Sequence, residues 1–261
     1  MRSASRAATL ASLLALAGAL PCAPAFAGEL LKLPTRPGVS TVVFWEPVAA
    51  PRATLLLLPG GAGGFGQVAQ GRATGANFLV RSAPLFAAQG FNVAVAGRPS
   101  DIDDLDYELR LGERHQTDLR EVLAELRRRS PAPVWLVGTS RGTVSAVAAA
   151  LRLQDQLAGL VLSSSIVAAG KTGNLASQDL AALKLPVLMV HHRQDACGVC
   201  PPAAVPTVLA KLSAAPVKQL LWADGGSTTS GEACGALHRH GYIGIEAEVV
   251  AQISAWIQHP K

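Results

Sequence analysis

Residues 138–142 read Gly-Thr-Ser-Arg-Gly and carry the clearest chemical signal in this sequence of 261 residues. They fit a Gly-x-Ser-x-Gly turn, in which a sharp strand-to-helix reversal presents a strained, exposed serine. The two glycines would remove side chains where the helix crosses the strand. The context supports the pattern, because the apolar run 134–137 precedes it and the alanine-rich segment 143–153 follows it. Ser140 is therefore the predicted nucleophile, and an ordinary glycine-rich turn is the alternative.

A serine hydroxyl becomes a useful nucleophile only when a base removes its proton and a carboxylate orients that base. After such a turn, the carboxylate and the histidine follow the serine along the chain. Asp195 comes just after the apolar run 187–191, and we prefer it to Asp224, which follows a later strand. His240 precedes the last expected helix, and we prefer it to His238. The predicted catalytic residues are thus Ser140, Asp195 and His240.

The negative charge that forms on an attacked carbonyl oxygen needs two backbone N–H donors in a dry pocket. One donor is expected from Arg141, the residue after the nucleophile. The other is expected from residues 59–64, Pro-Gly-Gly-Ala-Gly-Gly, where the amides of Gly61 and Ala62 are the candidates. No Lys-Ser or Lys-Thr pair follows these glycines, which disfavours a phosphate-binding loop.

Cys197, Cys200 and Cys234 allow three single disulfide pairings, each of which leaves one thiol over. A Cys197–Cys200 pair would raise a rival function, thiol–disulfide exchange, but it lacks the usual setting at a helix start in a βαβ unit. His191 and His192 lie close in sequence to these cysteines, yet zinc sites usually use four ligands at tighter spacing. We therefore predict no metal and no cofactor.

Strand-length apolar runs alternate with helical patterns, which favours one α/β domain with a mostly parallel sheet and helices on both faces. Helical spacing of apolar residues is clearest in 116–129, which ends in three arginines that suit a helix C-terminus. No gap is long enough for a second domain or for a large lid between 162 and 183. The expected strands are 41–45, 53–58, 91–96, 134–137, 157–162, 187–191 and 217–222; the expected helices are 77–89, 116–129, 143–153, 202–214 and 245–257; the widest irregular stretches are 97–115 and 225–244.

Residues 1–27 indicate a secretory signal peptide. Arg2 and Arg6 precede an uncharged apolar run, and residues 25–27, Ala-Phe-Ala, form a small-x-small cleavage site. The run is shorter than the roughly 20 residues that span a membrane. The mature chain is expected to begin near Gly28, to be periplasmic or secreted, and to have no stable membrane span. In an oxidising compartment, a disulfide is the default state of its cysteines.

The composition fits a folded domain over residues 28–261, because 49% of the whole chain is hydrophobic and 16% is charged. The formal charge of +5 becomes +3 (21 minus 18) once Arg2 and Arg6 are removed. No nucleic-acid partner is expected, because such proteins cluster basic residues on one face. The acidic residues between 101 and 108, together with His115 and His259, are expected to be solvated. The oligomeric state is left open.

Together these residues resemble the α/β-hydrolase superfamily over residues 41–257. The similarity is to small exported bacterial members with one cysteine just after the acid, here Cys197, and another before the histidine, here Cys234. Pro59 stands where the family often has a histidine, so the second oxyanion donor stays open between Gly61 and Ala62. The resemblance implies a Cys197–Cys234 disulfide that joins the acid loop to the histidine loop, with Cys197–Cys200 as the alternative pairing.

The resemblance also implies a serine esterase that cleaves a small or medium carboxylic ester through an acyl-enzyme on Ser140. Its partner would be a small ester-like substrate. A peptidase or amidase with the same catalytic residues is an alternative, as is a non-catalytic binding protein on the same scaffold.

Overall fold

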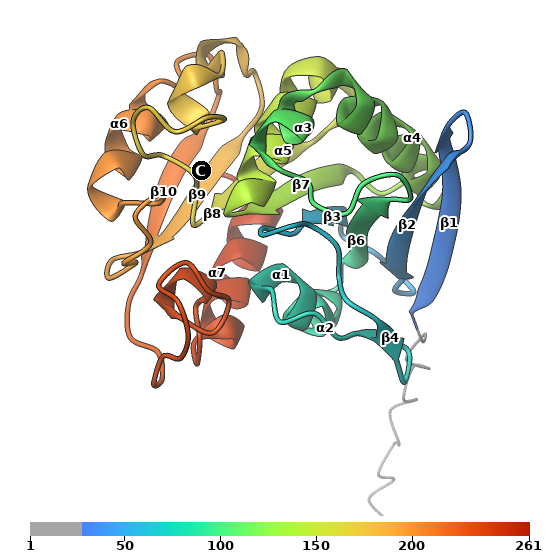
Figure 1. Cartoon of the computed structure of the whole chain (residues 1–261), viewed down its shortest axis with the longest axis horizontal. Coiled ribbons are helices and arrows are strands. Elements are labelled where there is room, and N and C mark those ends of the chain that lie inside the picture. Colours follow the sequence, from blue (N-terminus) through green and yellow to red (C-terminus); the bar gives the residue numbers. More distant parts are fainter. Residues whose placement is uncertain (1–27) are drawn as a thin grey trace, which may run out of the picture.

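The apolar runs of the sequence assemble into one eight-stranded sheet in the computed structural model, which describes residues 28–261 (Figure 1). The strand order is β1-β2-β6-β3-β7-β8-β9-β10. The pairings of β2 with β1 and with β6 are antiparallel, and all other pairings in this sheet are parallel. The predicted signal peptide, residues 1–27, lies outside the described residues. The strands of the sheet are β1 (Glu29–Arg36), β2 (Val39–Glu46), β3 (Thr54–Leu58), β6 (Asn92–Pro99), β7 (Val134–Thr139), β8 (Gly159–Ser163), β9 (Val187–His192) and β10 (Lys218–Ala223), and β4 (Val68–Ala69) pairs with β5 (Arg72–Ala73) in a small separate hairpin.

Helices cover both faces of the sheet, because successive side chains of a strand point to opposite faces. In β3, Leu56 and Leu58 pack into one core, and Leu55 and Leu57 pack into the other. Helices α4, α5 and α6 cover the first core, and α1, α2 and α7 cover the second. The helices are α1 (Phe78–Arg81), α2 (Ala83–Ala88), α3 (Tyr107–Leu111), α4 (Glu113–Arg129), α5 (Arg141–Leu153), α6 (Val205–Ala210) and α7 (Glu246–Gln258), and five 3₁₀ turns, η1 (Gln154–Gln156), η2 (Leu175–Ser177), η3 (Leu180–Ala182), η4 (Pro202–Ala204) and η5 (Arg239–Gly241), complete the described elements.

Several elements differ from the sequence-based expectation. Strand β1 was not predicted, because Pro34 interrupts its apolar alternation; the sheet tolerates this proline because β1 is an edge strand. The predicted helix 77–89 is two helices that break at Ser82, since Pro84 in the first turn of α2 has no N–H to donate. The stretch 97–115, expected to be irregular, contains α3. The predicted helix 202–214 is the turn η4 followed by the shorter α6.

The segment between β8 and β9 contains only the short turns η2 and η3, so the large lid that the sequence argued against is absent from the described residues. Within residues 28–261, no helix combines the length and the apolar character that crossing a membrane requires. The carboxyl ends of the parallel strands all lie at one edge of the sheet, and the loops after these strands contain the predicted site residues. Open α/β sheets bind their ligands at this edge.

Candidate active site

Ser140 lies in the turn between β7 and α5 with φ 52° and ψ −127°, a left-handed conformation that costs free energy in a residue with a side chain. Its backbone N–H donates to the carbonyl of Ser163, 3.0 Å away on the neighbouring strand β8. Its carbonyl accepts from both the amide and the hydroxyl of Thr143. These hydrogen bonds stabilise the strained turn. The side chain of Ser140, at the end of β7, is partly exposed.

The two glycines of the turn are required by close backbone contacts. A Cβ on Gly142 would lie 1.9 Å from the carbonyl oxygen of Leu58 in β3, well inside any allowed distance. A Cβ on Gly138 would lie 2.7 Å from the carbonyl oxygen of Gly142. The Gly-x-Ser-x-Gly spacing therefore follows from the way α5 crosses the ends of β3 and β7.

Asp195 and His240 meet in the interior, although 45 residues separate them. Oδ2 of Asp195 lies 2.8 Å from Nδ1 of His240, and Oδ1 accepts from the amide of Cys197 at 2.9 Å. Burial alone would raise the pKa of Asp195, but hydrogen bonds from His191 and His240 lower that pKa to about 2. Because the carboxylate is ionised and can only accept, Nδ1 of His240 carries a proton, and in the neutral imidazole the lone pair is therefore on Nε2.

The alternative acid and base lie elsewhere. Asp224 is exposed and pairs with Arg193, whose Nε is 2.9 Å from its Oδ2. His238 precedes the turn η5 and makes no hydrogen bond to Asp195. The structure therefore brings Asp195 together with His240, and not Asp224 with His238.

Ser140 and His240 line the same cavity of about 190 Å³ at the strand ends. Gly60, Gly61 and Asn77 form another part of its wall. Nε2 of His240 is buried and has no hydrogen-bond partner within residues 28–261. A serine with a strained backbone and a histidine with an unpartnered ring nitrogen therefore line one cavity, and proton abstraction from serine uses this pair of residue types once the two atoms come within hydrogen-bond distance.

The glycine-rich loop packs directly against the serine turn. A Cβ on Gly60 would lie 2.8 Å from Cβ of Ser140, so only glycine lets the loop backbone come this close. Gly61 has a positive φ of 58° and lines the cavity, whereas Ala62 does not. Arg141 is the first residue of α5, so its N–H has no acceptor within the helix. Its side chain pairs with Asp104 at 3.1 Å, away from these amides.

A disulfide joins Cys197 to Cys234, as the resemblance implies, and ties the loop after β9 to the loop before α7. Cys200 is free and buried, and its Sγ donates to the carbonyl of Ser164 at 3.2 Å. Burial raises the pKa of the Cys200 thiol well above its usual range, and the charge of Asp195 adds to the rise. A neutral, buried thiol is a poor nucleophile, which disfavours thiol–disulfide exchange as a function.

Potential metal-ligating atoms come together at one place in the described chain. Three residues, Cys197, Cys200 and His240, each contribute one potential ligand atom, and these three atoms lie within 4.8 Å of one another. The sulfur of Cys197 is bonded to Cys234, so these residues do not form a thiolate ligand set while the disulfide is intact. His191 and His192, which lie close to the cysteines in sequence, do not contribute atoms to this group: His191 bonds to the carbonyl of Cys200 and His192 to that of Gly225.

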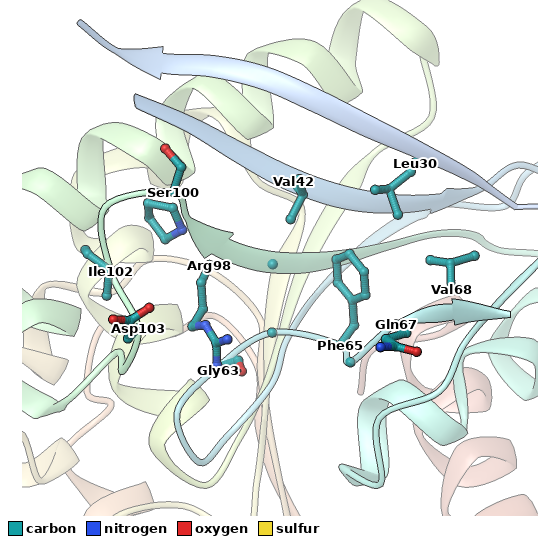
Figure 2. Close-up of a pocket in the computed structure, with 14 residues that line it drawn as sticks. Leu30, Val42, Gly63, Phe65, Gln67, Val68, Arg98, Ser100, Ile102 and Asp103 are labelled. Carbon is teal, nitrogen blue, oxygen red and sulfur yellow. Dashed lines mark hydrogen bonds between the residues drawn. The ribbon is translucent and has the colours of Figure 1, made fainter. Parts of the chain in front are cut away.

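A second, larger cavity of about 690 Å³ lies on the other side of the glycine-rich loop. Figure 2 shows its walls, with Phe65 and Val68 from the loop side and Val42 and Leu30 from the β1–β2 side. Arg98 and Asp103 supply polar atoms at its opposite end. None of the predicted catalytic residues lines this cavity, whereas Ser140 and His240 both line the smaller one.

Sequence reasoning missed three buried polar residues near the site. His191 lies 3.4 Å from Oδ2 of Asp195 and contributes to the low pKa of that carboxyl. Arg110 and His115, the latter expected to be solvated, are both buried behind the glycine-rich loop. The only sequence signal for Arg110 and His115 was their place in the long stretch 97–115, because the burial of a polar side chain leaves no periodic pattern. The neighbouring Asp101 is also engaged, since it pairs with Arg36 at 2.7 Å.

Solved structures share this arrangement of strands, helices and loops. A serine hydrolase without a lid from Xanthomonas campestris is 18% identical with a TM-score of 0.58, and the match covers 90% of this chain and 95% of that one. An esterase from Pyrococcus furiosus is 14% identical with a TM-score of 0.64, covering 88% and 91%. A monoglyceride lipase from Saccharomyces cerevisiae is 11% identical with a TM-score of 0.62, covering 89% and 95%.

The similarity to these structures is a similarity of fold, and it confirms the predicted fold class. No protein-family model matches the sequence, and no curated protein matches it either.

Proposed function

Since this chain has the α/β-hydrolase fold, we propose that it is a serine hydrolase that cleaves a small or medium carboxylic ester through an acyl-enzyme on Ser140. One observation carries the proposal. The buried Asp195–His240 pair, joined at 2.8 Å, leaves Nε2 of His240 without a partner in the cavity that Ser140 also lines. A buried imidazole nitrogen with no partner costs free energy, and such atoms occur at functional sites where a reaction uses them.

In the proposed reaction, Nε2 of His240 removes the proton of Ser140 as Oγ attacks the ester carbonyl. Asp195 keeps the proton of the imidazole on Nδ1 and stabilises the imidazolium that forms. The developing oxyanion would accept from the amide of Arg141 and from that of Gly61, with Ala62 as the alternative donor. His240 then protonates the leaving alcohol, and water releases the acid from Ser140 by the same steps in reverse order.

A fluorophosphonate probe tests the nucleophile. The native protein should be labelled at Ser140, and Ser140→Ala should remove the label, while Ser230→Ala at an exposed position should not change it. Absence of labelling in the native, folded protein would leave only a binding protein on this scaffold. Labelling that persists in Ser140→Ala would place the nucleophile at another residue.

The chain offers matched controls for the acid and the base. Asp195→Asn should lower kcat by about 10⁴-fold because it reverses the tautomer of the histidine, whereas Asp224→Asn, at the exposed competitor, should leave kcat unchanged. His240→Ala should abolish turnover, whereas His238→Ala should not. Equal losses in the two aspartate variants would contradict the proposed roles.

The cavity of about 190 Å³ next to Ser140 supports a short acyl group more than a long one. A panel of acyl esters from two carbons upward should show kcat/KM falling once the acyl chain exceeds this space. Matched amide substrates decide the bond type, because a peptidase or amidase would cleave them at rates comparable to the esters.

We also propose that the protein is exported and processed near Gly28. The proposal is supported by the sequence of residues 1–27 and by the Cys197–Cys234 disulfide, a bond that oxidising compartments favour. N-terminal sequencing of the native protein from its host should begin at or near Gly28, and recovery of an intact Met1 terminus would contradict processing.

A further inference from the structure

Arg110, in the short helix α3, is buried directly behind the glycine-rich loop, with 1% of its surface exposed. Within residues 28–261 its guanidinium makes no ion pair with a carboxylate. A buried cation without a counter-charge is costly, and natural folds keep one only when many acceptors surround it. The burial of Arg110 is therefore explained by the groups to which its guanidinium donates hydrogen bonds.

Its acceptors are neutral and nearly all belong to the backbone. Nε donates to the carbonyl of Leu105 at 2.8 Å, and Nη1 donates to the hydroxyl of Ser145 in α5 at 2.9 Å. Nη2 donates to two carbonyls of the glycine-rich loop, that of Pro59 at 3.2 Å and that of Gly61 at 3.1 Å. One planar group thus ties the loop to α3 and, through Ser145, to the helix that begins after Ser140.

Two further carbonyls of the loop are also engaged. The carbonyl of Gly60 accepts from the amide of Gly63 at 3.1 Å, and that of Ala62 accepts from the amide of Leu105 at 3.0 Å. Every carbonyl from 59 to 62 therefore has a donor. Because the C=O and N–H of a trans peptide point in opposite directions, fixing the carbonyls of this segment also fixes the directions of its amides.

A loop with three glycines in residues 60–63 would otherwise sample many conformations, since glycine adopts positive and negative φ with similar ease. Oxyanion stabilisation depends on donors that are already in place before the charge develops. In addition, a peptide whose carbonyl accepts from a cation is polarised, which strengthens its N–H as a donor. The peptide between Gly61 and Ala62 is in this position, so the strengthened N–H is that of Ala62, the alternative donor. The N–H of Gly61 belongs to the preceding peptide, whose carbonyl accepts from the amide of Gly63.

We propose that Arg110 is a positioning residue for the reaction: it holds residues 59–62 in the conformation that presents oxyanion donors to the substrate on Ser140. The proposal rests on the proposed hydrolase function. Arg110 acts through the loop, because it does not line the cavity that contains Ser140. The only cavity that it does line among those described has a volume of about 10 Å³, too little to let a chain of waters replace its contacts.

The test compares Arg110→Gln and Arg110→Lys with the control Arg114→Gln, which removes an exposed arginine just after α3. With a short ester, Arg110→Gln should lower kcat about 100-fold with little change in KM, the size expected when a donor is misplaced by about 1 Å. Arg110→Lys keeps the charge but its ammonium cannot span all four acceptors, so it should lose at least about 10-fold. Arg114→Gln should match the native protein.

A trifluoromethyl ketone separates a positioning role from a structural one, because its adduct on Ser140 carries an oxyanion. Its Ki should rise in Arg110→Gln by the same factor by which kcat/KM falls, while the Ki of the product acid should not change. Unchanged kcat and unchanged ketone affinity in both Arg110 variants would overturn the proposal. If Arg110→Gln does not fold, the same two measurements on Arg110→Lys decide.

Hydrogen exchange of the peptide that contains residues 60–63 distinguishes failure of this inference from failure of the proposed function. Exchange should be at least about 10-fold faster in the Arg110 variants than in Arg114→Gln, whether or not the protein hydrolyses esters. A native protein that is inactive but shows this difference would overturn the hydrolase function and leave the loop-holding role of Arg110 supported. An active protein without this difference would overturn the role of Arg110 alone.

Discussion

His115 is buried beside Arg110, and we predict that its protonation limits the stability of the protein in mild acid. Its side chain is in contact with Ser145, whose Oγ lies 2.9 Å from Nε2, and only 4% of its surface is exposed. Burial, together with the charges of Arg110 and Arg36, lowers the pKa of His115 from 6.5 to about 3. In the unfolded chain, this imidazole would titrate with an ordinary pKa.

Proton binding determines whether the protein becomes more or less stable as the pH falls. Between the two pKa values the unfolded chain binds a proton at His115 and the folded protein does not, so the free energy of unfolding falls as the pH falls. The contribution is complete above pH 6.5 and is lost progressively down to about pH 3. A shift of this size corresponds to about 5 kcal/mol in total, of which about 2 kcal/mol is lost by pH 5. Typical domains have only about 5–15 kcal/mol to lose.

Urea unfolding at pH 7.5 and at pH 5.0 measures the effect. The native protein should lose about 2 kcal/mol more over this interval than His115→Gln, which cannot take up the proton. His259→Gln, at an exposed position, should show the same pH dependence as the native protein. An identical pH dependence in His115→Gln and in the native protein would refute the argument.

Three further predictions concern the elements that hold the site. The double variant Cys197→Ser/Cys234→Ser removes a disulfide between residues 37 positions apart. By the chain-entropy relation, this disulfide contributes about 4 kcal/mol to the free energy of unfolding. Its loss should therefore lower Tm by about 8–15 °C in a thermal scan. Gly142→Ala should lose fluorophosphonate labelling and stability together, because its Cβ would collide with the carbonyl of Leu58; circular dichroism and labelling check both. Below pH 4 the free energy of unfolding of the native protein should fall by about 2 kcal/mol more than that of Asp195→Asn, because the pKa of Asp195 is about 2 in the folded state and 3.8 in the unfolded chain. Urea unfolding at a series of acidic pH values measures this difference.

The parts of the site that could be predicted from sequence are those that a local pattern or the chain order specifies. The serine turn needs glycines at fixed positions because α5 passes against the carbonyl of Leu58, and that requirement is visible as Gly-x-Ser-x-Gly. Asp195 follows the strand β9 and His240 precedes the helix α7, so each lies next to an element that the sequence pattern indicates. Strand alternation with helices is periodic, so the layered fold was predictable as well.

The parts that could not be predicted depend on contacts between distant segments. Arg110 looks like any surface arginine in the sequence, and its burial follows from the way α3 packs behind residues 59–62. The division of the predicted helix 77–89 at Ser82 is a different case, because Pro84 signals it in the sequence and the apolar pattern of the segment outweighed that signal. The choice between Gly61 and Ala62 as oxyanion donor likewise depends on the path of the loop, which places Gly61, and not Ala62, in the cavity wall.

Arg110, His115 and Ser145 form one buried polar cluster behind the loop, and its energetics link stability to the proposed catalysis. Oγ of Ser145 contacts both Nη1 of Arg110 and Nε2 of His115. Because Ser145 has one hydroxyl proton and accepts from Arg110, it can donate to a neutral His115, whereas an imidazolium could not accept that bond. Protonation of His115 would place a second cation beside Arg110 and strain the contacts that hold the glycine-rich loop. We therefore expect the protection factors of residues 60–63, which correct for the intrinsic pH dependence of exchange, to fall in acid before global unfolding, and to fall less in His115→Gln.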